Sequence, residues 1–318
     1  MLAALGVSLI HKWPLPAIAA GRAQPLESDA LFFAGDSPAS IYRLPASEPG
    51  QMAGRAAATA AESVPLAAAT CDVFGLHGSP NGRWIAVDVG CAAGSHTLLL
   101  QTVTGQVRPT AAEPWRSSFF LNWAPDGDSF LLRVDPIGDD LILLVDARDG
   151  RSVRMDTPPF TYDVAFSPDG GRVLYAVSRG LGFGSEMWLM DWDGRNERVI
   201  APADAGHGYP PAWSPDGRQV AFVARENPGD SAADVAAPYL ESNIHLADVA
   251  SGRARAVTQF EGALTDGPAW SPDGAWLAFS ADAGGVADVW LVEVASGAAQ
   301  QVTQGADARY PVWLADAR

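Results

Sequence analysis

The sequence predicts an all-β protein, a six-bladed β-propeller built from four-stranded antiparallel blades. Three observations predict this fold: a turn motif of the type Ser-Pro-Asp-Gly recurs five times, apolar runs of strand length follow each copy, and successive copies lie 43 to 57 residues apart. The motif prolines lie 45, 43, 47 and 57 residues apart, at Pro80, Pro125, Pro168, Pro215 and Pro272. This period is typical of a propeller blade and of few other all-β units.

Each motif predicts the tight turn between the first and second strands of a blade. The clearest copy follows Trp213, occupies residues 214–217 and precedes the apolar run 220–223. Proline presets φ at the first corner, aspartate hydrogen-bonds to nearby backbone, and glycine adopts the positive φ that the turn requires. We therefore expect the motif aspartates to be structural and not catalytic.

A second apolar run in four of the repeats predicts the third strand of the blade. These runs precede Asp-Gly or Ser-Gly pairs and occupy residues 141–145, 187–190, 244–249 and 289–294. Such pairs favour tight hairpin loops, so a fourth antiparallel strand is expected after each one.

The two ends of the chain are expected to share the sixth blade. Residues 310–313 repeat the pattern of a first strand, whereas residues 30–34 and 41–44 read as second and third strands with no first strand before them. Pairing the C-terminal strand with the N-terminal ones closes the ring and removes two open sheet edges. We expect one propeller domain over residues 30–318, preceded by an apolar segment over residues 1–29.

The repeated Trp-Ser-Pro-Asp-Gly followed by an apolar strand resembles the TolB-like, WD40-like (PD40) β-propeller repeat over residues 30–318. The first repeat departs from the pattern at Gly78 and Asn81, and the last replaces the turn by residues 314–316. The resemblance implies the propeller fold. It also implies a superfamily that spans binding scaffolds, envelope proteins and the propeller halves of serine peptidases, with TolB-like members outside the cytoplasm.

The charge balance is strongly acidic, with 37 carboxylates against 21 basic residues and a net charge of -16. Such a chain repels phosphate backbones, so nucleic acid is not an expected partner. The apolar residues 1–9 and the small residues 17–19 resemble two parts of an export signal. The segment lacks the positively charged n-region of such a signal, and its apolar run is short for a membrane span. We expect a periplasmic, cell-surface or extracellular protein with no stable membrane span; the alternative is a cytoplasmic protein whose first segment packs on the propeller.

The two cysteines give a second indication of compartment. Cys71 and Cys91 flank the turn at Asn81 symmetrically and face each other across one predicted hairpin. A cross-strand disulfide fits an oxidising compartment, and two buried free thiols are the alternative.

The predicted site is the face where the fourth strand of one blade leads to the first strand of the next, around the channel mouth. Two long loops, 178–185 and 225–242, are expected on the same face. The position four residues before each motif aromatic or its equivalent gives a mostly aromatic ring: Phe74, Phe119, Tyr162, Tyr209, Asp266 and Arg309. Asp163 and His207 are expected beside it. This ring suits a peptide segment, a sugar or a terminal carboxylate, unless its aromatic residues only pack between blades.

Catalytic patterns are scarce in the sequence. The five histidines show no pair at metal-ligand spacing, and no Gly-x-Ser-x-Gly motif is present. We therefore expect a non-enzymatic protein without cofactor or metal, which binds a protein or peptide partner at the channel mouth. The alternatives are a metal-dependent or hydrolytic enzyme for a small polar substrate, using Asp163, His207, Asp266 and Arg309, or a regulatory propeller of a separate hydrolase.

Overall fold

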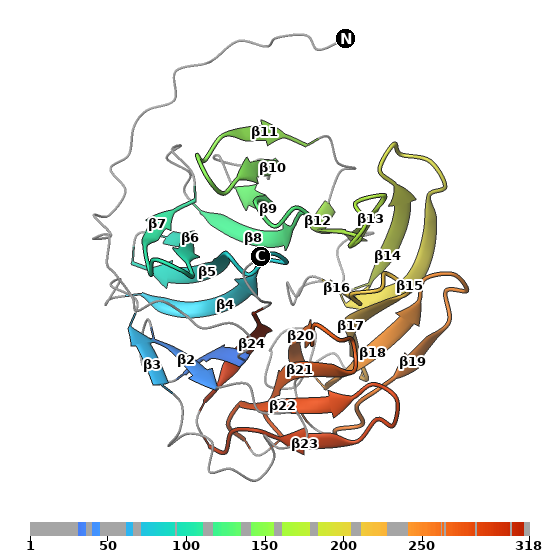
Figure 1. Ribbon diagram of the computed structural model, residues 1–318. Coiled ribbons are helices and arrows are strands. Elements are labelled where there is room, and N and C mark those ends of the chain that lie inside the picture. The colour runs from blue at the N-terminus through green and yellow to red at the C-terminus, as the bar shows by residue number, and fades with distance from the viewer. Residues whose placement is uncertain are drawn as a thin grey trace.

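The computed structural model shows six four-stranded antiparallel sheets arranged as the blades of a ring (Figure 1). The six-bladed propeller predicted from the repeats is therefore confirmed. The structure describes residues 31–35, 40–44, 62–65, 71–92, 94–110, 117–134, 141–155, 161–178, 184–204, 211–227, 241–261, 263, 265–283, 285–305 and 307–314. The segment 1–29 lies outside these ranges. Within them, no helix is long and apolar enough to cross a bilayer.

Five blades are continuous in sequence. The first contains β4 (Asp72–Gly78), β5 (Trp84–Cys91), β6 (Gly94–Gln101) and β7 (Val107–Pro109); the second contains β8 (Ser118–Trp123), β9 (Ser129–Val134), β10 (Leu141–Asp146) and β11 (Ser152–Arg154). The third contains β12 (Thr161–Phe166), β13 (Arg172–Ser178), β14 (Gly184–Asp191) and β15 (Arg198–Asp204). The fourth contains β16 (Ala212–Trp213), β17 (Gln219–Arg225), β18 (Ser242–Asp248) and β19 (Ala254–Ala256), and the fifth β20 (Thr265–Trp270), β21 (Trp276–Ala281), β22 (Asp288–Glu293) and β23 (Ala299–Gln301).

The closing blade joins the two ends of the chain, as predicted. It contains β24 (Arg309–Trp313), β1 (Leu31–Ala34), β2 (Ser40–Leu44) and β3 (Glu62–Pro65) in that order. β24 pairs antiparallel with β1, with Leu31 opposite Trp313 and Phe32 opposite Val312. The closed ring leaves no open edge between its first and last repeats.

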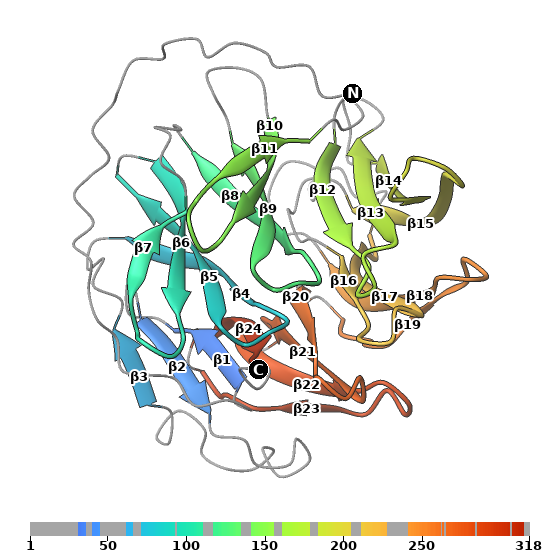
Figure 2. The same cartoon turned by 45° about the horizontal axis from the view of Figure 1, so that its top comes forward.

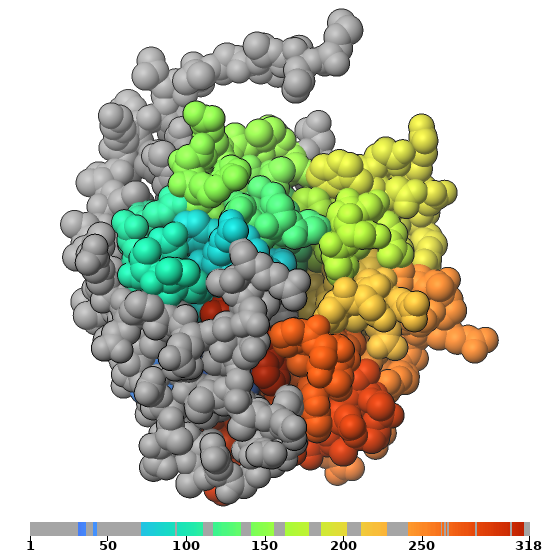
Figure 3. All heavy atoms as spheres, viewed as in Figure 1, coloured from blue at the N-terminus to red at the C-terminus, as the bar shows by residue number. Residues whose placement is uncertain are grey.

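The hydrophobic core lies between the blades. It divides into six clusters of buried side chains, one at each interface between neighbouring blades. The second strand of a blade contributes to two clusters because its alternate side chains face the two neighbouring blades, as in β5 and β21. In the space-filling view the coloured blades follow one another around the ring in sequence order (Figure 3).

Three motif tryptophans, Trp123, Trp213 and Trp270, each tie their blade to the one before it through the indole N–H. The indole Nε1 donates from Trp123 to the His77 carbonyl at 2.9 Å, and from Trp270 to the Ala212 carbonyl at 2.9 Å. Gly78 replaces tryptophan in the first blade because a Cβ there would lie 2.8 Å from the Trp313 carbonyl oxygen. The departure noted in the sequence therefore follows from a close approach of the closing blade.

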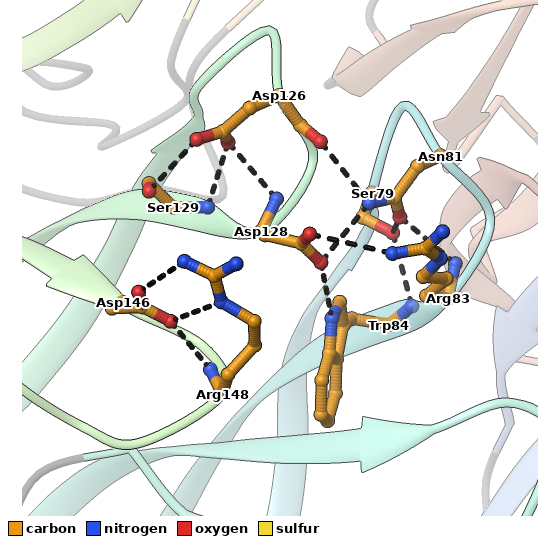
Figure 4. Close-up of polar contacts among 9 residues, drawn as sticks. All are labelled: Ser79, Asn81, Arg83, Trp84, Asp126, Asp128, Ser129, Asp146 and Arg148. Atoms are coloured by element: carbon orange, nitrogen blue, oxygen red, sulfur yellow. Dashed lines mark hydrogen bonds and ion pairs between the residues drawn. The ribbon is translucent and has the colours of Figure 1, made fainter.

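The Ser-Pro-Asp-Gly turns confirm the structural role predicted for their aspartates (Figure 4). The carboxylate Oδ1 of Asp126 accepts hydrogen bonds from the backbone N–H groups of Asp128 and Ser129 at 2.9 and 2.8 Å. The turn of the third blade is similar, because Asp169 accepts from the Ser167 hydroxyl at 2.5 Å and from the Gly171 N–H at 3.0 Å. The hydrogen bond from the Ser167 hydroxyl is the largest cause of the lowered pKa of Asp169.

Asn81 replaces the motif aspartate because it bonds to the neighbouring turn. Its Nδ2 donates to the Asp126 carbonyl and to the Asp128 carboxylate, both at 3.1 Å. Asp128 also accepts from Trp84 Nε1 at 3.2 Å and pairs with Arg83 at 3.4 Å (Figure 4). A carboxylate at position 81 would repel Asp128 and could not donate to it.

The cysteines form the cross-strand disulfide, which settles the alternative left open by the sequence. Cys71 lies directly before β4, Cys91 ends β5, and their Cα atoms are 4.5 Å apart. The next residues of the same hairpin, Asp72 and Gly90, are directly paired. The disulfide therefore fixes the end of the β4–β5 hairpin that lies away from its turn.

Candidate functional site

The predicted site lies at the end of the ring where the innermost strands begin. These strands are β24, β4, β8, β12, β16 and β20, and each contacts the next around the ring (Figure 2). The Ser-Pro-Asp-Gly turns leave them at the opposite end. We call the end where the innermost strands begin the mouth, and the end with the turns the turn face.

Two of the predicted aromatic residues meet at the mouth. The ring centroids of Phe74 in β4 and Phe119 in β8 are 6.0 Å apart, with an interplanar angle of 53°. Both side chains are half-buried. Phe74 also lies over Gly90, where a Cβ would be 3.7 Å from its Cδ1 atom. The aromatic pair thus joins two blades and keeps part of its surface accessible.

Arg133 extends this pair, and no pattern in the sequence indicated it. Its guanidinium carbon lies 5.1 Å from the centroid of the Phe119 ring, a cation–π arrangement. Arg133 stands opposite Phe119 in the β8–β9 pair, where the register shifts between Phe120 and Asn122. This register shift is a β-bulge in β8. If the pairing continued regularly from the turn, Arg133 would stand opposite Phe120. Only the structure shows this shift.

Asp163 in β12 is the buried carboxylate of the mouth, with 5% of its surface exposed. Desolvation raises its pKa to about 6, and the positive charge of Arg133 opposes that rise. A carboxylate kept in a desolvated position beside a specific charge is typical of a functional site.

Arg309 lies on a strained part of the chain at the start of β24. Asp307, two residues before it, and Tyr310, directly after it, have φ values of 43° and 55°, in the left-handed region that side-chain-bearing residues rarely adopt. The Nε of Arg309 donates to Asp307 Oδ1 at 2.9 Å, and the Tyr310 N–H donates to Ser280 Oγ at 3.0 Å. Backbone strain of this kind gathers at binding and catalytic sites.

The positions of the other predicted site residues at the mouth remain predictions. Tyr162 and Asp266 lie in β12 and β20, but the structure describes only their backbone. Tyr209 and His207 fall outside the described residues. Among the described residues of the predicted site, Phe74 and Phe119 are in ring contact. Asp163 interacts electrostatically with Arg133, which was not among the predicted residues.

His77 lies near the turn-face end of β4, away from the mouth, and has a structural environment. His77 Nε2 lies 3.2 Å from Asp88 Oδ2, and its ring stacks on Phe120 with centroids 4.4 Å apart. Asp88 also accepts from the Thr97 hydroxyl at 2.5 Å and from the Phe120 N–H at 3.1 Å. In the part of the chain that the structure describes, no three histidine, cysteine or acidic side chains are grouped to hold a metal ion.

The two long loops predicted on this face fall largely outside the described ranges, at residues 179–183 and 228–240. The base of the second loop is described, because the Glu226 N–H donates to the Glu241 carbonyl at 2.8 Å. Glu226 Oε1 also lies 2.9 Å from His245 Nε2. This loop leaves β17 and enters β18, so its base lies on the mouth side of the fourth blade.

Comparison with known proteins supports the fold and the repeat type. The chain is 31% identical over 197 residues to an uncharacterised protein of Agrobacterium fabrum, an alignment that covers 61% of this chain and 59% of that protein. It is 32% identical over 115 residues to the Tol-Pal system protein TolB of Gluconobacter oxydans, covering 36% of this chain and 22% of TolB. A 25% identical match to dipeptidyl-peptidase 5 of Porphyromonas gingivalis covers 45% of this chain and 21% of the peptidase. The chain thus spans less than two thirds of these relatives.

The fold is shared with a solved TolB structure. TolB from Acinetobacter baumannii superposes with a TM-score of 0.66 at 16% sequence identity, over 91% of this chain and 67% of TolB. The family model of the TolB β-propeller domain, PD40, matches residues 182–318. Residues 182–318 therefore match the PD40 TolB β-propeller domain, and the whole ring is a six-bladed propeller that shares its fold with TolB.

Proposed function

We propose that this protein binds a segment of a partner protein at the mouth of the propeller. The observation that carries the proposal is the Phe74–Phe119 pair with the Arg133 guanidinium over the Phe119 ring, together with the desolvated carboxylate of Asp163, which interacts with the charge of Arg133. Half-buried aromatic rings and arginine are the side chains that contribute most to protein interfaces.

The chemistry of these residues favours an extended segment with an apolar side chain and a carboxylate. The apolar side chain would stack on the two phenyl rings, and the carboxylate would accept from a guanidinium. Beside Phe74, Phe119, Arg133 and Asp163, the proposed surface includes the other predicted positions: Tyr162, Tyr209, Asp266, Arg309 and His207. The likeness to a Tol-Pal system protein supports a function within a set of interacting proteins.

The enzymatic alternative has less support. Of its four residues, the structure describes the side chains of Asp163 and Arg309, and Arg309 hydrogen-bonds to Asp307. The match to dipeptidyl-peptidase 5 covers only 21% of that enzyme. Peptide binding, which propeller scaffolds perform through their loops, is therefore the function we retain.

Selection of peptides tests this function. A library of random linear peptides is panned against the purified protein, and the selected peptides are measured against Phe119→Ala and Arg133→Gln. We expect each change to weaken binding about tenfold or more, equivalent to about 1.4 kcal/mol. The matched control is Val153→Ala, because Val153 lies on the outer strand β11 and is 68% exposed.

Two results would contradict the proposal. One is a library that yields no peptide binding above that of an unrelated acidic protein. The other is a set of peptides that bind Phe119→Ala and Arg133→Gln as well as they bind the unaltered protein. Thermal melting of each variant confirms that the ring is still folded.

We also propose that the protein works in an oxidising compartment, on the periplasmic, cell-surface or extracellular side. The disulfide between Cys71 and Cys91 supports this, because disulfides persist there and are rare in reduced cytosol. Alkylation with a thiol reagent, applied during extraction from the producing cells, should modify neither cysteine until a reductant is added. Modification of both cysteines without reductant would place the protein in a reducing compartment.

A further inference from the structure

The third blade departs from the other four complete blades at one structurally equivalent position. In all five, the residue directly after the third strand donates its N–H to the carbonyl group that follows the Ser-Pro-Asp-Gly-type turn. The donors are Thr102, Ala147, Trp192, Val249 and Val294. Thr102, Ala147 and Val249 are 2% exposed or less and Val294 is half-buried, whereas Trp192 is 49% exposed.

The exposure of Trp192 is a property of its side chain and not of a displaced backbone. Its N–H makes the equivalent bond, to the Gly171 carbonyl at 3.0 Å. An indole cannot occupy the space that threonine, alanine or valine fills between blades, so it lies on the surface. It rests against Phe166, with ring centroids 5.2 Å apart and an interplanar angle of 45°. Phe166 is itself buried at the end of β12.

The surroundings of Trp192 are acidic. Asp191 and Asp193 flank it in the hairpin between β14 and β15, on the outer rim of the ring (Figure 1). Within the hairpin, Arg195 pairs with Asp193 at 3.3 Å and Asn196 Nδ2 donates to Asp191 Oδ2 at 2.6 Å, while Arg198 donates to the Val249 carbonyl of the fourth blade. A half-exposed indole beside carboxylates favours a guanidinium or ammonium group, because the indole face attracts cations and the carboxylates add Coulomb attraction.

We propose that Trp192 is the centre of a second binding surface, which takes an arginine- or lysine-bearing segment of a partner protein. The surface lies on the turn face, at the opposite end of the ring from the mouth. The cationic group stacks on the Trp192 indole with Asp191 and Asp193 beside it. The proposal does not depend on peptide binding at the mouth.

The same peptide library tests this surface with different variants. Trp192→Val installs the residue that the fourth and fifth blades carry at this position, Val249 and Val294. We expect a class of selected peptides rich in arginine or lysine whose binding falls about tenfold with Trp192→Val, the upper range of a cation–π contact. Phe119→Ala should leave this class unchanged, and Val103→Ala, at a 61% exposed position on the turn face, is the matched control.

Several outcomes would overturn the proposal. They are the absence of any Trp192-dependent peptide, a Trp192-dependent class without basic residues, or equal binding to Trp192→Val. Sedimentation of the protein alone adds another: a dimer that Trp192→Val dissociates would make a second copy the occupant. If Trp192→Val lowers the thermal midpoint, Asp193→Asn is used in its place, and an unchanged affinity for the basic peptides would then count against the proposal.

Discussion

Replacing Asp88 by alanine should lower the free energy of unfolding by about 3 to 5 kcal/mol, the range found when one partner of a buried charged network is removed. Asp88 is 4% exposed and holds two blades together. Its carboxylate accepts from the Thr97 hydroxyl in its own blade and from the Phe120 N–H in the next, and it lies 3.2 Å from His77. Without it, a buried N–H and a buried hydroxyl lose their acceptor.

Urea denaturation of the Asp88→Ala variant measures this loss. Asp88→Asn keeps the shape and one carbonyl acceptor, so its loss should be smaller. The control is Asp149→Ala, because Asp149 is exposed in the hairpin after β10. A change below about 1 kcal/mol for Asp88→Ala would mean that the three contacts are not formed together in the folded protein.

Replacing Asp163 by asparagine should stabilise the protein at neutral pH. The folded-state pKa of Asp163, about 6, lies above its ordinary value of 3.8. The folded protein therefore holds the proton more tightly, and this carboxyl group contributes a stability that falls as pH rises through that window. At about 1.4 kcal/mol per pKa unit, asparagine should raise the unfolding free energy at pH 7 by up to about 3 kcal/mol.

Denaturation of both proteins at a series of pH values isolates the contribution of Asp163. The difference between Asp163→Asn and the unaltered protein should be small at acid pH and grow above the ordinary pKa of aspartate. Other carboxylates contribute equally to both proteins, so their contributions cancel in the difference in unfolding free energy. An example is Asp146, whose pKa is shifted in the opposite direction, to about 2, by its hydrogen bond to Arg148. A difference that does not vary with pH would contradict a buried, costly carboxylate at the mouth.

The ring itself could be predicted from sequence because each level of the pattern gives the same answer. The turn motif fixes its own local structure, the apolar runs fix the strands, and the incomplete repeats at the two ends require each other. The closing blade, with β24 paired to β1, follows from these facts. Gly78 and Asn81 were visible as departures, but their reasons lie in residues of neighbouring blades, Trp313 and Asp128.

The mouth could be predicted only in part because its innermost strands are irregular. Register shifts occur in β4 between Val73 and Gly75, in β8 between Phe120 and Asn122, and in β12 between Thr161 and Asp163. A bulge adds one unpaired residue and turns the following side chains to the other face of the sheet. Counting from the motif therefore found Phe74 and Phe119 but could not find Arg133.

The proposal that the mouth binds a partner segment can be tested by a crystal structure of the protein with a selected peptide whose binding depends on Phe119 and Arg133. We expect a peptide side chain against the Phe74 and Phe119 rings and a peptide carboxylate within hydrogen-bond distance of the Arg133 guanidinium. A peptide that lies elsewhere on the ring, with Phe74 and Phe119 uncovered, would contradict the assignment of the mouth as the binding site.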